Sequence, residues 1–221
     1  MFHLLGKYWP QAPRFLIGGY RMPPSDIRAG FYRIGRFSDY PVNKWSNSLI
    51  EFLRYVEDEI VLLMMDDYWL TAPANHEKIT VLADYLQAHQ NVARLDLSAD
   101  RLGASGWTDI ETLWGLDDLI LSSPQSPYHF SFQAALWRKS LLLDCLVPDE
   151  SPWESEMYGT DRLAQRGYLV IGTKHPPLRY TIAVQKGKIA LDGGYQGKDY
   201  SVPIDDAVDI LERHWIPEGL A

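Results

Sequence analysis

Two adjacent carboxylates, Asp66 and Asp67, follow an unbroken apolar run at residues 60–65. Such a run, without alternation of polar and apolar positions, predicts a strand that is buried on both faces. Ligands of open α/β sheets bind outside the carboxyl ends of the strands. Mg²⁺ or Mn²⁺ is often held there by one or two carboxylates together with substrate phosphates. We therefore expect a divalent ion and a diphosphate at this pair. The alternative is that the two residues only end the strand and begin a turn.

A second pair of carboxylates, Glu154 and Glu156, lies at the start of a helix that we expect over residues 152–167. A general base that deprotonates a hydroxyl group is often such a carboxylate. Acidic residues at a helix start also cap the helix and interact favourably with its dipole. The residues alone leave both interpretations open.

Aromatic and histidine side chains supply further candidates. Trp69 and Trp153 could stack on a sugar ring, although packing in the core is the commoner role of such rings. The six histidines show no zinc-ligand spacing. His129 could reach a site from a loop, with a structural role as its alternative. The sequence contains no P-loop, no dinucleotide-binding glycine motif and no hydrolase nucleophile elbow.

Composition and charge narrow the class of protein. The 221 residues are 46% hydrophobic, as in an ordinary globular protein, and the net charge is −8. This charge disfavours tight binding to a nucleic-acid backbone. Five arginines could still form a local basic face, or could be solvated or paired: they are Arg14, Arg21, Arg28, Arg33 and Arg36. Cys145 is the single cysteine, which excludes an intrachain disulfide, and its apolar surroundings predict a buried structural thiol.

The elements that must position these residues alternate between strand and helix. We expect helices over residues 1–9, 45–57, 75–90, within 131–146, 152–167 and 205–215, and strands over 14–17, 30–35, 60–65, 92–97 and 168–171. Residues 103–127 should mix loop and short strand, and residues 180–191 could form a hairpin. The alternation predicts an α/β fold with a mostly parallel sheet and helices on both faces. No apolar run is long enough for a transmembrane helix and no signal peptide is evident, so we expect a soluble cytoplasmic protein.

Five segments in a particular order resemble small bacterial and phage glycosyltransferases of the GT-A fold: residues 7–10, 45–49, 62–68, 132–137 and 152–156. The resemblance covers roughly residues 1–180 and implies one GT-A-like, Rossmann-like domain over 1–221. GT-A folds usually open with a strand that helps to hold the nucleobase, whereas this chain opens in a helix. We therefore expect the first strand to be missing or supplied differently.

The resemblance also implies a donor site. In GT-A enzymes a carboxylate motif after a central strand binds a divalent metal and the sugar-nucleotide diphosphate, a role that falls here on Asp66 and Asp67. The family motif is commonly Asp-x-Asp, whereas this pair is adjacent. In an extended strand only one of the two can face the metal. We favour Asp67 as the metal ligand, with Asp66 orienting ribose or a water molecule and Trp69 on the donor side.

On the acceptor side, inverting GT-A enzymes have an acidic residue at a helix start facing the acceptor. This implies Glu156 as the general base, with Glu154 as the second candidate. Trp153 and His129 are the expected acceptor contacts. Asp161 and Arg162 resemble residues that support the acceptor or the diphosphate, and an ordinary surface helix is the alternative for both.

The resemblance implies a nucleotide-sugar-dependent glycosyltransferase that transfers a sugar to a hydroxyl of a saccharide, and we expect the transfer to invert the anomeric configuration. A UDP-sugar is the favoured donor and Mn²⁺ or Mg²⁺ the implied cofactor. One alternative is a phage-type DNA glycosyltransferase acting on hydroxymethylated bases, which the acidic net charge disfavours. Another is a degenerate GT-A domain that binds a sugar without catalysis, which the missing first strand motivates.

Overall fold

The computed structural model describes residues 2–22, 29–104, 106–113, 117–185 and 188–189. These residues belong to two compact units. The larger unit is built from residues 13–64 and 76–177, and the smaller unit from the described parts of 1–12, 65–75 and 178–221.

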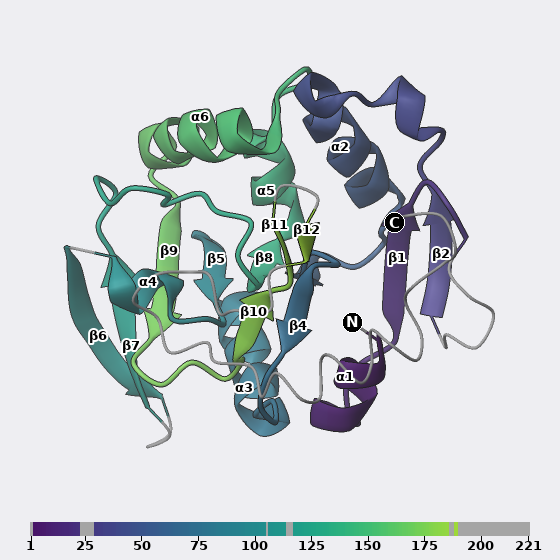
Figure 1. Ribbon diagram of the computed structural model, residues 1–221. Coiled ribbons are helices and arrows are strands. Elements are labelled where there is room, and N and C mark those ends of the chain that lie inside the picture. Colours follow the sequence, from purple (N-terminus) through teal and green to yellow (C-terminus); the bar gives the residue numbers. More distant parts are fainter. Residues whose placement is uncertain (1, 23–28, 105, 114–116, 186–187, 190–221) are drawn as a thin grey trace. The chain divides into compact units, whose positions relative to one another are not determined.

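A six-stranded sheet forms the centre of the larger unit, in the order β3-β8-β5-β9-β7-β6 (Figure 1). Its strands are β3 (Ile60–Leu63), β5 (Val92–Asp96), β6 (Trp107–Leu113), β7 (Asp117–Ser122), β8 (Ala135–Arg138) and β9 (Leu169–Thr173). β5 pairs in parallel with β9, and the other four pairings are antiparallel. Strands β3, β5, β6 and β9 therefore run in one direction, and β7 and β8 run in the other.

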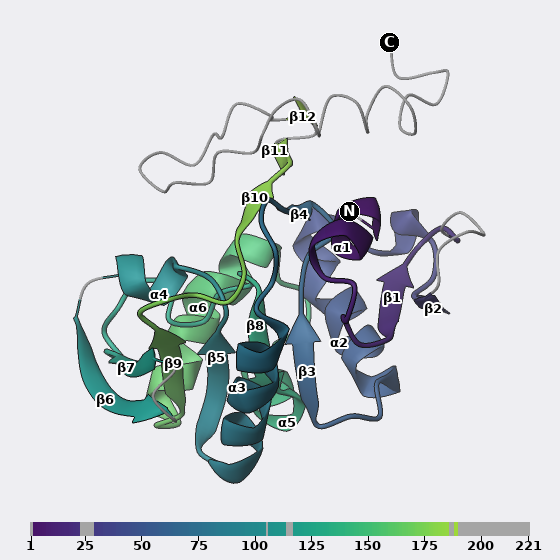
Figure 2. The same ribbon diagram turned by 90° about the horizontal axis from the view of Figure 1, so that it is seen from below.

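Helices cover both faces of this sheet (Figure 2). α3 (His76–Ala88) packs on one face, and α5 (Lys139–Cys145) packs on the other with α2 (Trp45–Tyr55) and α6 (Pro152–Gln165) against it. The short helix α4 (Asp100–Gly103) follows β5. All five residues of β5 are buried, because helices lie above and below this strand. The carboxyl end of β5 thus places a fully buried charged residue, Asp96, in the sheet.

A separate pair of parallel strands, β1 (Phe15–Gly19) and β2 (Ala29–Arg33), precedes α2 in the larger unit. Two short 3₁₀ helices at Phe37–Asp39 and Val42–Lys44 connect β2 to α2. The register places Gly19 beside Arg33, so the residues that follow β1 lie near the end of β2.

The smaller unit contains α1 (Phe2–Tyr8) and the antiparallel pair β4 (Tyr68–Leu70) and β10 (Tyr180–Ile182). A two-residue ladder joins β11 (Val184–Gln185) to β12 (Lys188–Ile189). The rings of Tyr68 and Tyr180 stack with their centroids 4.7 Å apart, and this contact stabilises the pairing of β4 with β10.

Most predicted elements are confirmed, including the opening helix and the stop of α6 at Gly167, whose φ of +69° suits glycine. The predicted hairpin over 180–191 is confirmed in part, as β11–β12. The predicted helix over 205–215 lies outside the described residues.

The α/β class is confirmed, but the prediction of a mostly parallel sheet is wrong, because the sheet is mixed. The alternation of strand and helix correctly implies that β3 and β5 run in the same direction. It cannot show that β8, from much later in the chain, is inserted between them. The region 103–127 also contains the antiparallel pair β6–β7, which the sequence pattern leaves undefined.

The described residues include no helix with both the length and the apolar character needed to cross a bilayer. Cys145 is buried, as predicted, and burial raises the pKa of its thiol to about 11. The prediction of one glycosyltransferase domain over 1–221 stays a prediction.

The packing of α6 against the Phe130 ring can be tested at Gly159. A methyl group there would approach the Phe130 ring to 2.8 Å, so the Gly159→Ala variant must displace the ring or the helix. We expect a loss of about 1–3 kcal/mol in the free energy of unfolding, measured by urea titration. Gly6→Ala is the matched control, because its methyl group would meet no atom within 4 Å. Equal stability of Gly159→Ala and the parent protein would contradict this close packing.

Candidate functional site

The carboxylate pair Asp66–Asp67 lies in a turn rather than in an extended strand. The turn is closed by a hydrogen bond of 3.2 Å from the N–H of Tyr68 to the carbonyl of Met65. The extended backbone that we expected would place the two side chains on opposite faces. That argument does not apply to a turn, so it no longer selects Asp67 over Asp66 as the metal ligand.

The electrostatics of this turn suit a cation. Asp66 is exposed, whereas Asp67 is half-buried. Burial, and then the negative charge of Asp66, raise the pKa of Asp67 to about 6. A bound divalent ion would relieve both effects, and the two carboxylates therefore fit Mg²⁺ or Mn²⁺ chemically.

No group of three or more His, Cys, Asp or Glu side chains among the described residues could hold a metal ion. An ion at Asp66 and Asp67 would take its remaining ligands from water and from a substrate phosphate, as Mg²⁺ commonly does.

The side chain of the neighbouring Trp69 is positioned for packing in the core rather than for contact with a ligand. Its side chain is only 4% exposed in β4, where its backbone pairs with Thr181 of β10. The expected contact of Trp69 with a donor sugar would require the ring to leave this position.

Glu154 is a capping residue of α6. The Ser151 hydroxyl accepts a hydrogen bond from the N–H of Glu154 (3.3 Å), and the Glu154 carboxylate accepts one from the N–H of Ser151 (2.8 Å). These bonds from Ser151 hold the pKa of Glu154 below its ordinary value. A carboxylate stabilised in this way is a weak base, so the geometry favours the helix-capping interpretation for Glu154.

Glu156 has the opposite environment. Its Oε1 accepts a hydrogen bond of 2.8 Å from the N–H of Phe132. Burial raises the pKa of Glu156, and this effect exceeds the lowering by the Phe132 N–H, the Arg94 charge and the Ser131 hydroxyl. A carboxylate with a raised pKa accepts a proton more readily at neutral pH. Of the two predicted base candidates, Glu156 has the properties of a general base.

Thr160 and Gly159 fix the helix that carries Glu156. The N–H of Phe130 donates to the Thr160 hydroxyl at 3.1 Å, and that hydroxyl donates to the carbonyl of Glu156 at 2.7 Å. The Phe130 ring lies directly against Gly159. Segment 130–132 and the first half of α6 therefore form one tightly connected structure.

Trp153 lies beside Glu156 on α6, since residues three positions apart are neighbours on a helix surface. It is 64% exposed, so its ring is free to stack on a ligand. Asp161 is also exposed. Arg162 is engaged instead in a two-pronged ion pair with Glu150, with both N–O distances 2.8 Å, and donates to the carbonyl of Cys145.

His129 is buried beneath the surface, at 1% exposure, with its Nδ1 3.2 Å from the Ser122 hydroxyl. Burial, and then the charges of Arg101 and Arg94, lower its pKa to about 4. The imidazole is therefore neutral at pH 7. Direct contact of His129 with an acceptor, which we expected, would require this side chain to become exposed.

A cluster of four charged residues at the carboxyl end of β5 was not predicted. Nη2 of Arg94 lies 3.2 Å from Asp96 and 3.3 Å from Asp100, and Nη2 of Arg101 lies 2.9 Å from Asp100. Burial raises the pKa of Asp96, while the charge of Arg94 opposes this. The sequence signal was the pair Arg94 and Asp96, two positions apart in a strand, because such residues share one face.

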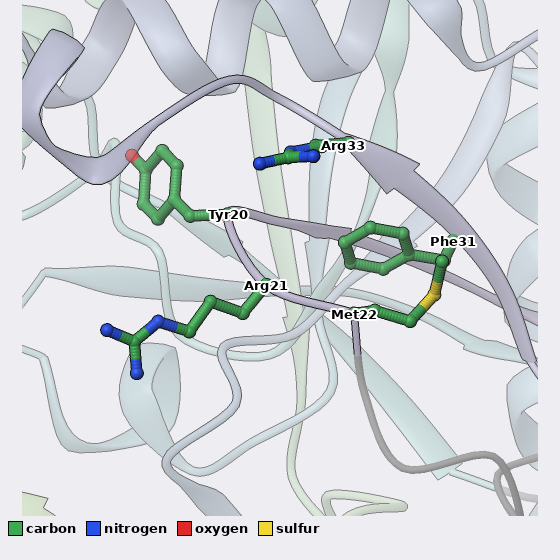
Figure 3. Close-up of a pocket in the computed structure, with 5 residues that line it drawn as sticks. All are labelled: Tyr20, Arg21, Met22, Phe31 and Arg33. Atoms are coloured by element: carbon green, nitrogen blue, oxygen red, sulfur yellow. The ribbon is translucent and has the colours of Figure 1, made fainter.

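A shallow pocket of about 470 Å³ lies beside β1 and β2 in the larger unit (Figure 3). It is lined by Tyr20, Arg21, Met22, Phe31 and Arg33. Both arginines are exposed, and neither forms an ion pair with another described residue. Two cations beside aromatic rings suit an anionic ligand that has a flat or apolar part.

Comparison with protein-family models, with curated proteins and with solved structures found no match to this chain.

Asp66→Asn tests the coupling within the carboxylate pair. Removing the neighbouring charge should lower the pKa of Asp67, which can be measured by NMR titration of ¹³C-labelled carboxyl groups. The control variant Asp58→Asn should leave the pKa of Asp67 unchanged. The parent protein binds more protons folded than unfolded between about pH 4 and 6 at Asp67, so the contribution of this residue to stability falls as pH rises. Asp66→Asn should weaken that fall. An unchanged Asp67 titration in Asp66→Asn would show that the two carboxylates do not interact.

Proposed function

We propose that this chain is an inverting, nucleotide-sugar-dependent glycosyltransferase whose acceptor is a hydroxyl of a saccharide. The observation that carries the proposal is the partly buried Glu156 carboxylate, oriented by the Phe132 N–H and carried on the same helix as an exposed tryptophan, Trp153. The order of the sequence segments that resemble GT-A enzymes supports the same class.

In the proposed reaction Glu156 accepts the proton of the acceptor hydroxyl while the hydroxyl oxygen attacks the anomeric carbon of the donor. The new C–O bond forms as the bond from that carbon to the diphosphate breaks, and the diphosphate leaves with the electron pair. Attack from the side opposite the leaving group inverts the configuration. Trp153 would support the acceptor sugar by stacking.

The leaving diphosphate develops negative charge that the protein must stabilise. Asp66 and Asp67 would hold Mn²⁺ or Mg²⁺, which would supply positive charge to the diphosphate when bound. Within the larger unit, Arg21 and Arg33 of the pocket beside β1 and β2 are cations suited to an anionic ligand. We favour a UDP-sugar as the donor.

DNA with hydroxymethylated bases is a second candidate acceptor, because positive charge is concentrated in one part of the chain. Residues 13–56 contain seven arginines and lysines against three acidic residues, although the net charge of the whole chain is −8. Arg14, Arg21, Arg33 and Arg36 are exposed. The acidic remainder of the chain would repel a long duplex, so we favour the saccharide.

The donor site is tested by calorimetric titration of UDP with and without Mn²⁺. We expect Mn²⁺ to tighten UDP binding to the parent protein, and we expect Asp67→Ala to remove most of that gain. Asp58→Ala, at an exposed position outside the turn, is the control. Equal UDP affinity in Asp67→Ala and the parent protein, with Mn²⁺ present, would refute the assignment of Asp67.

The catalytic role of Glu156 is tested by comparing Glu156→Gln with Glu154→Gln in sugar transfer. Loss of a general base typically costs about 10²–10⁴-fold in rate, so Glu156→Gln should lose transfer while retaining donor binding. Glu154→Gln should lose much less, because Glu154 caps the helix. The reverse pattern would exchange the two roles.

The same assay should offer saccharides and hydroxymethylated DNA with a panel of nucleotide sugars, and detect products by mass. A mass gain on DNA alone would establish the second candidate acceptor. Donor binding without hydrolysis or transfer to any acceptor would support a non-catalytic sugar-binding domain.

A further inference from the structure

The strand pair β1–β2 has one face against α2 and a second face turned away from it. The Tyr32 hydroxyl donates to Glu51 of α2 at 3.1 Å, and the Tyr32 ring stacks on Tyr55 of α2 with centroids 4.2 Å apart. Successive residues of a strand point to opposite faces. Phe31 and Arg33, on either side of Tyr32 in β2, therefore point away from α2.

The face turned away from α2 holds the shallow pocket of Figure 3, to which Phe31 and Arg33 contribute together with residues that follow β1. In that view the guanidinium groups of Arg21 and Arg33 lie on one side of the pocket. The side chains of Met22 and Phe31 lie on the other side. Two cations and two apolar groups thus share one hollow of about 470 Å³.

Phe37 adds a further apolar side chain at this pocket. Its ring meets the ring of Tyr20 edge-on with centroids 5.5 Å apart, and Tyr20 lines the pocket. Phe37 and Met22 are each 74% exposed, more than any other large hydrophobic side chain of the described residues. Single exposed apolar residues are ordinary on a protein surface. Here the two most exposed ones lie at the same pocket, beside two arginines.

The aromatic wall of the pocket is anchored to α2 from behind. The Tyr20 ring also packs on the Tyr40 ring, with centroids 5.9 Å apart. The Tyr40 hydroxyl donates to Glu51, the same carboxylate that accepts from Tyr32. The exposed groups are therefore carried by a preformed surface.

The part of the chain that forms this surface is locally basic. Residues 13–56 carry seven basic and three acidic side chains, a balance of +4 in a chain of net charge −8. Two of these acidic side chains have internal partners: Glu51 binds the tyrosines, and Asp39 accepts from the N–H of Arg36 at 3.1 Å. Arg21, Arg33 and Arg36 are exposed. The surface is complementary to a polyanion.

The exposed apolar side chains distinguish between the polyanions. A DNA duplex presents phosphates to the arginines but little apolar surface to Met22 and Phe37. An anionic bilayer presents phosphates at its surface and hydrocarbon just beneath them. Cationic side chains next to exposed apolar ones are the combination that binds such an interface.

We propose that the pocket residues and Phe37 form a membrane-docking surface, through which the larger unit binds an anionic lipid bilayer. Arg21 and Arg33 bind lipid phosphates, as guanidinium groups do in two-pronged hydrogen bonding. Met22 and Phe37 enter the layer of lipid headgroups. This inference does not depend on the proposed function.

The direct test is sedimentation of the full chain with lipid vesicles. The parent protein should bind vesicles of equal parts phosphatidylglycerol and phosphatidylcholine and should not bind vesicles of phosphatidylcholine alone. Salt should weaken the binding, because it screens exposed charges. Arg21→Gln/Arg33→Gln should weaken it roughly 30-fold, about five-fold for each arginine. Equal binding to both kinds of vesicle, or by the parent and the double variant, would overturn the proposal.

Matched variants separate this surface from general attraction. Arg54→Gln removes an exposed arginine from α2, which covers the opposite face of the strand pair, and should weaken binding much less than Arg33→Gln. Met22→Ser should weaken binding, whereas Met157→Ser, at a half-exposed methionine of α6, should not. Equal effects within either pair would contradict docking through this surface.

A second measurement reports contact directly and needs no loss of binding. Cys145 is buried, so an environment-sensitive fluorophore attaches selectively to a new cysteine in Met22→Cys or Met157→Cys. Anionic vesicles should shift the emission of the label at position 22 to the blue and leave that at position 157 unchanged. No shift at position 22 in vesicle-bound protein would overturn the proposal.

Duplex DNA serves as the competing ligand. If DNA binds through Arg21 and Arg33 while anionic vesicles do not bind, the membrane inference fails and the DNA acceptor is favoured. Vesicle binding that depends on these arginines, in a protein that transfers no sugar, would leave the docking surface standing while the proposed function fails.

Discussion

The ion pair between Arg94 and Asp96 in the central strand β5 is the constraint on which the surrounding structure depends. Both residues are fully buried, and each must find partners there because water is excluded. The partners come from the chain immediately after the strand: Ser98, Asp100 and Arg101 turn back over the end of β5. The guanidinium group of Arg101 then donates to the carbonyl of Pro127, which ties the loop before β8 to the same point.

The loop that this network supports is the platform for α6. The Phe130 ring packs against Trp137 and Phe132. The backbone N–H groups of Phe130 and Phe132 bind Thr160 and Glu156 of α6. The environment of Glu156 is therefore set by backbone groups and by packing, which move less than exposed side chains. The same helix carries the exposed Trp153, so a partly buried carboxylate and an exposed ring occur on one element.

Local patterns predicted the elements well but predicted the surroundings of the candidate residues poorly. The turn at Asp66 and Asp67 follows the predicted strand, but the prediction that this strand is buried on both faces is wrong. β3 lies at an edge of the six-stranded sheet, and Leu63 is its one buried residue. Ser151 and Glu154 are spaced as a capping box, a pattern that separates Glu154 from Glu156 once it is applied. The partners of Glu156 and of Arg94 lie 24 or more residues away in several cases, so no local pattern could identify them. His129 and Trp69 were predicted to bind ligands because of their residue types. Both side chains are buried in the tertiary structure, which no local pattern shows.

The insertion of β8 between β3 and β5 has a consequence for the order in which the chain can fold. During synthesis, residues 60–63 and 92–96 emerge from the ribosome well before residues 135–138, and those two strands do not pair with each other in the final sheet. In the nascent chain, neither strand has its final partner until β8 emerges, and the second edge of β5 pairs later still, with β9. Open edges of this kind invite pairing with other chains. The first pairing of β3 and β5 thus waits for a segment that begins more than seventy residues after β3 does, and β8 is the segment that then covers one edge of each strand.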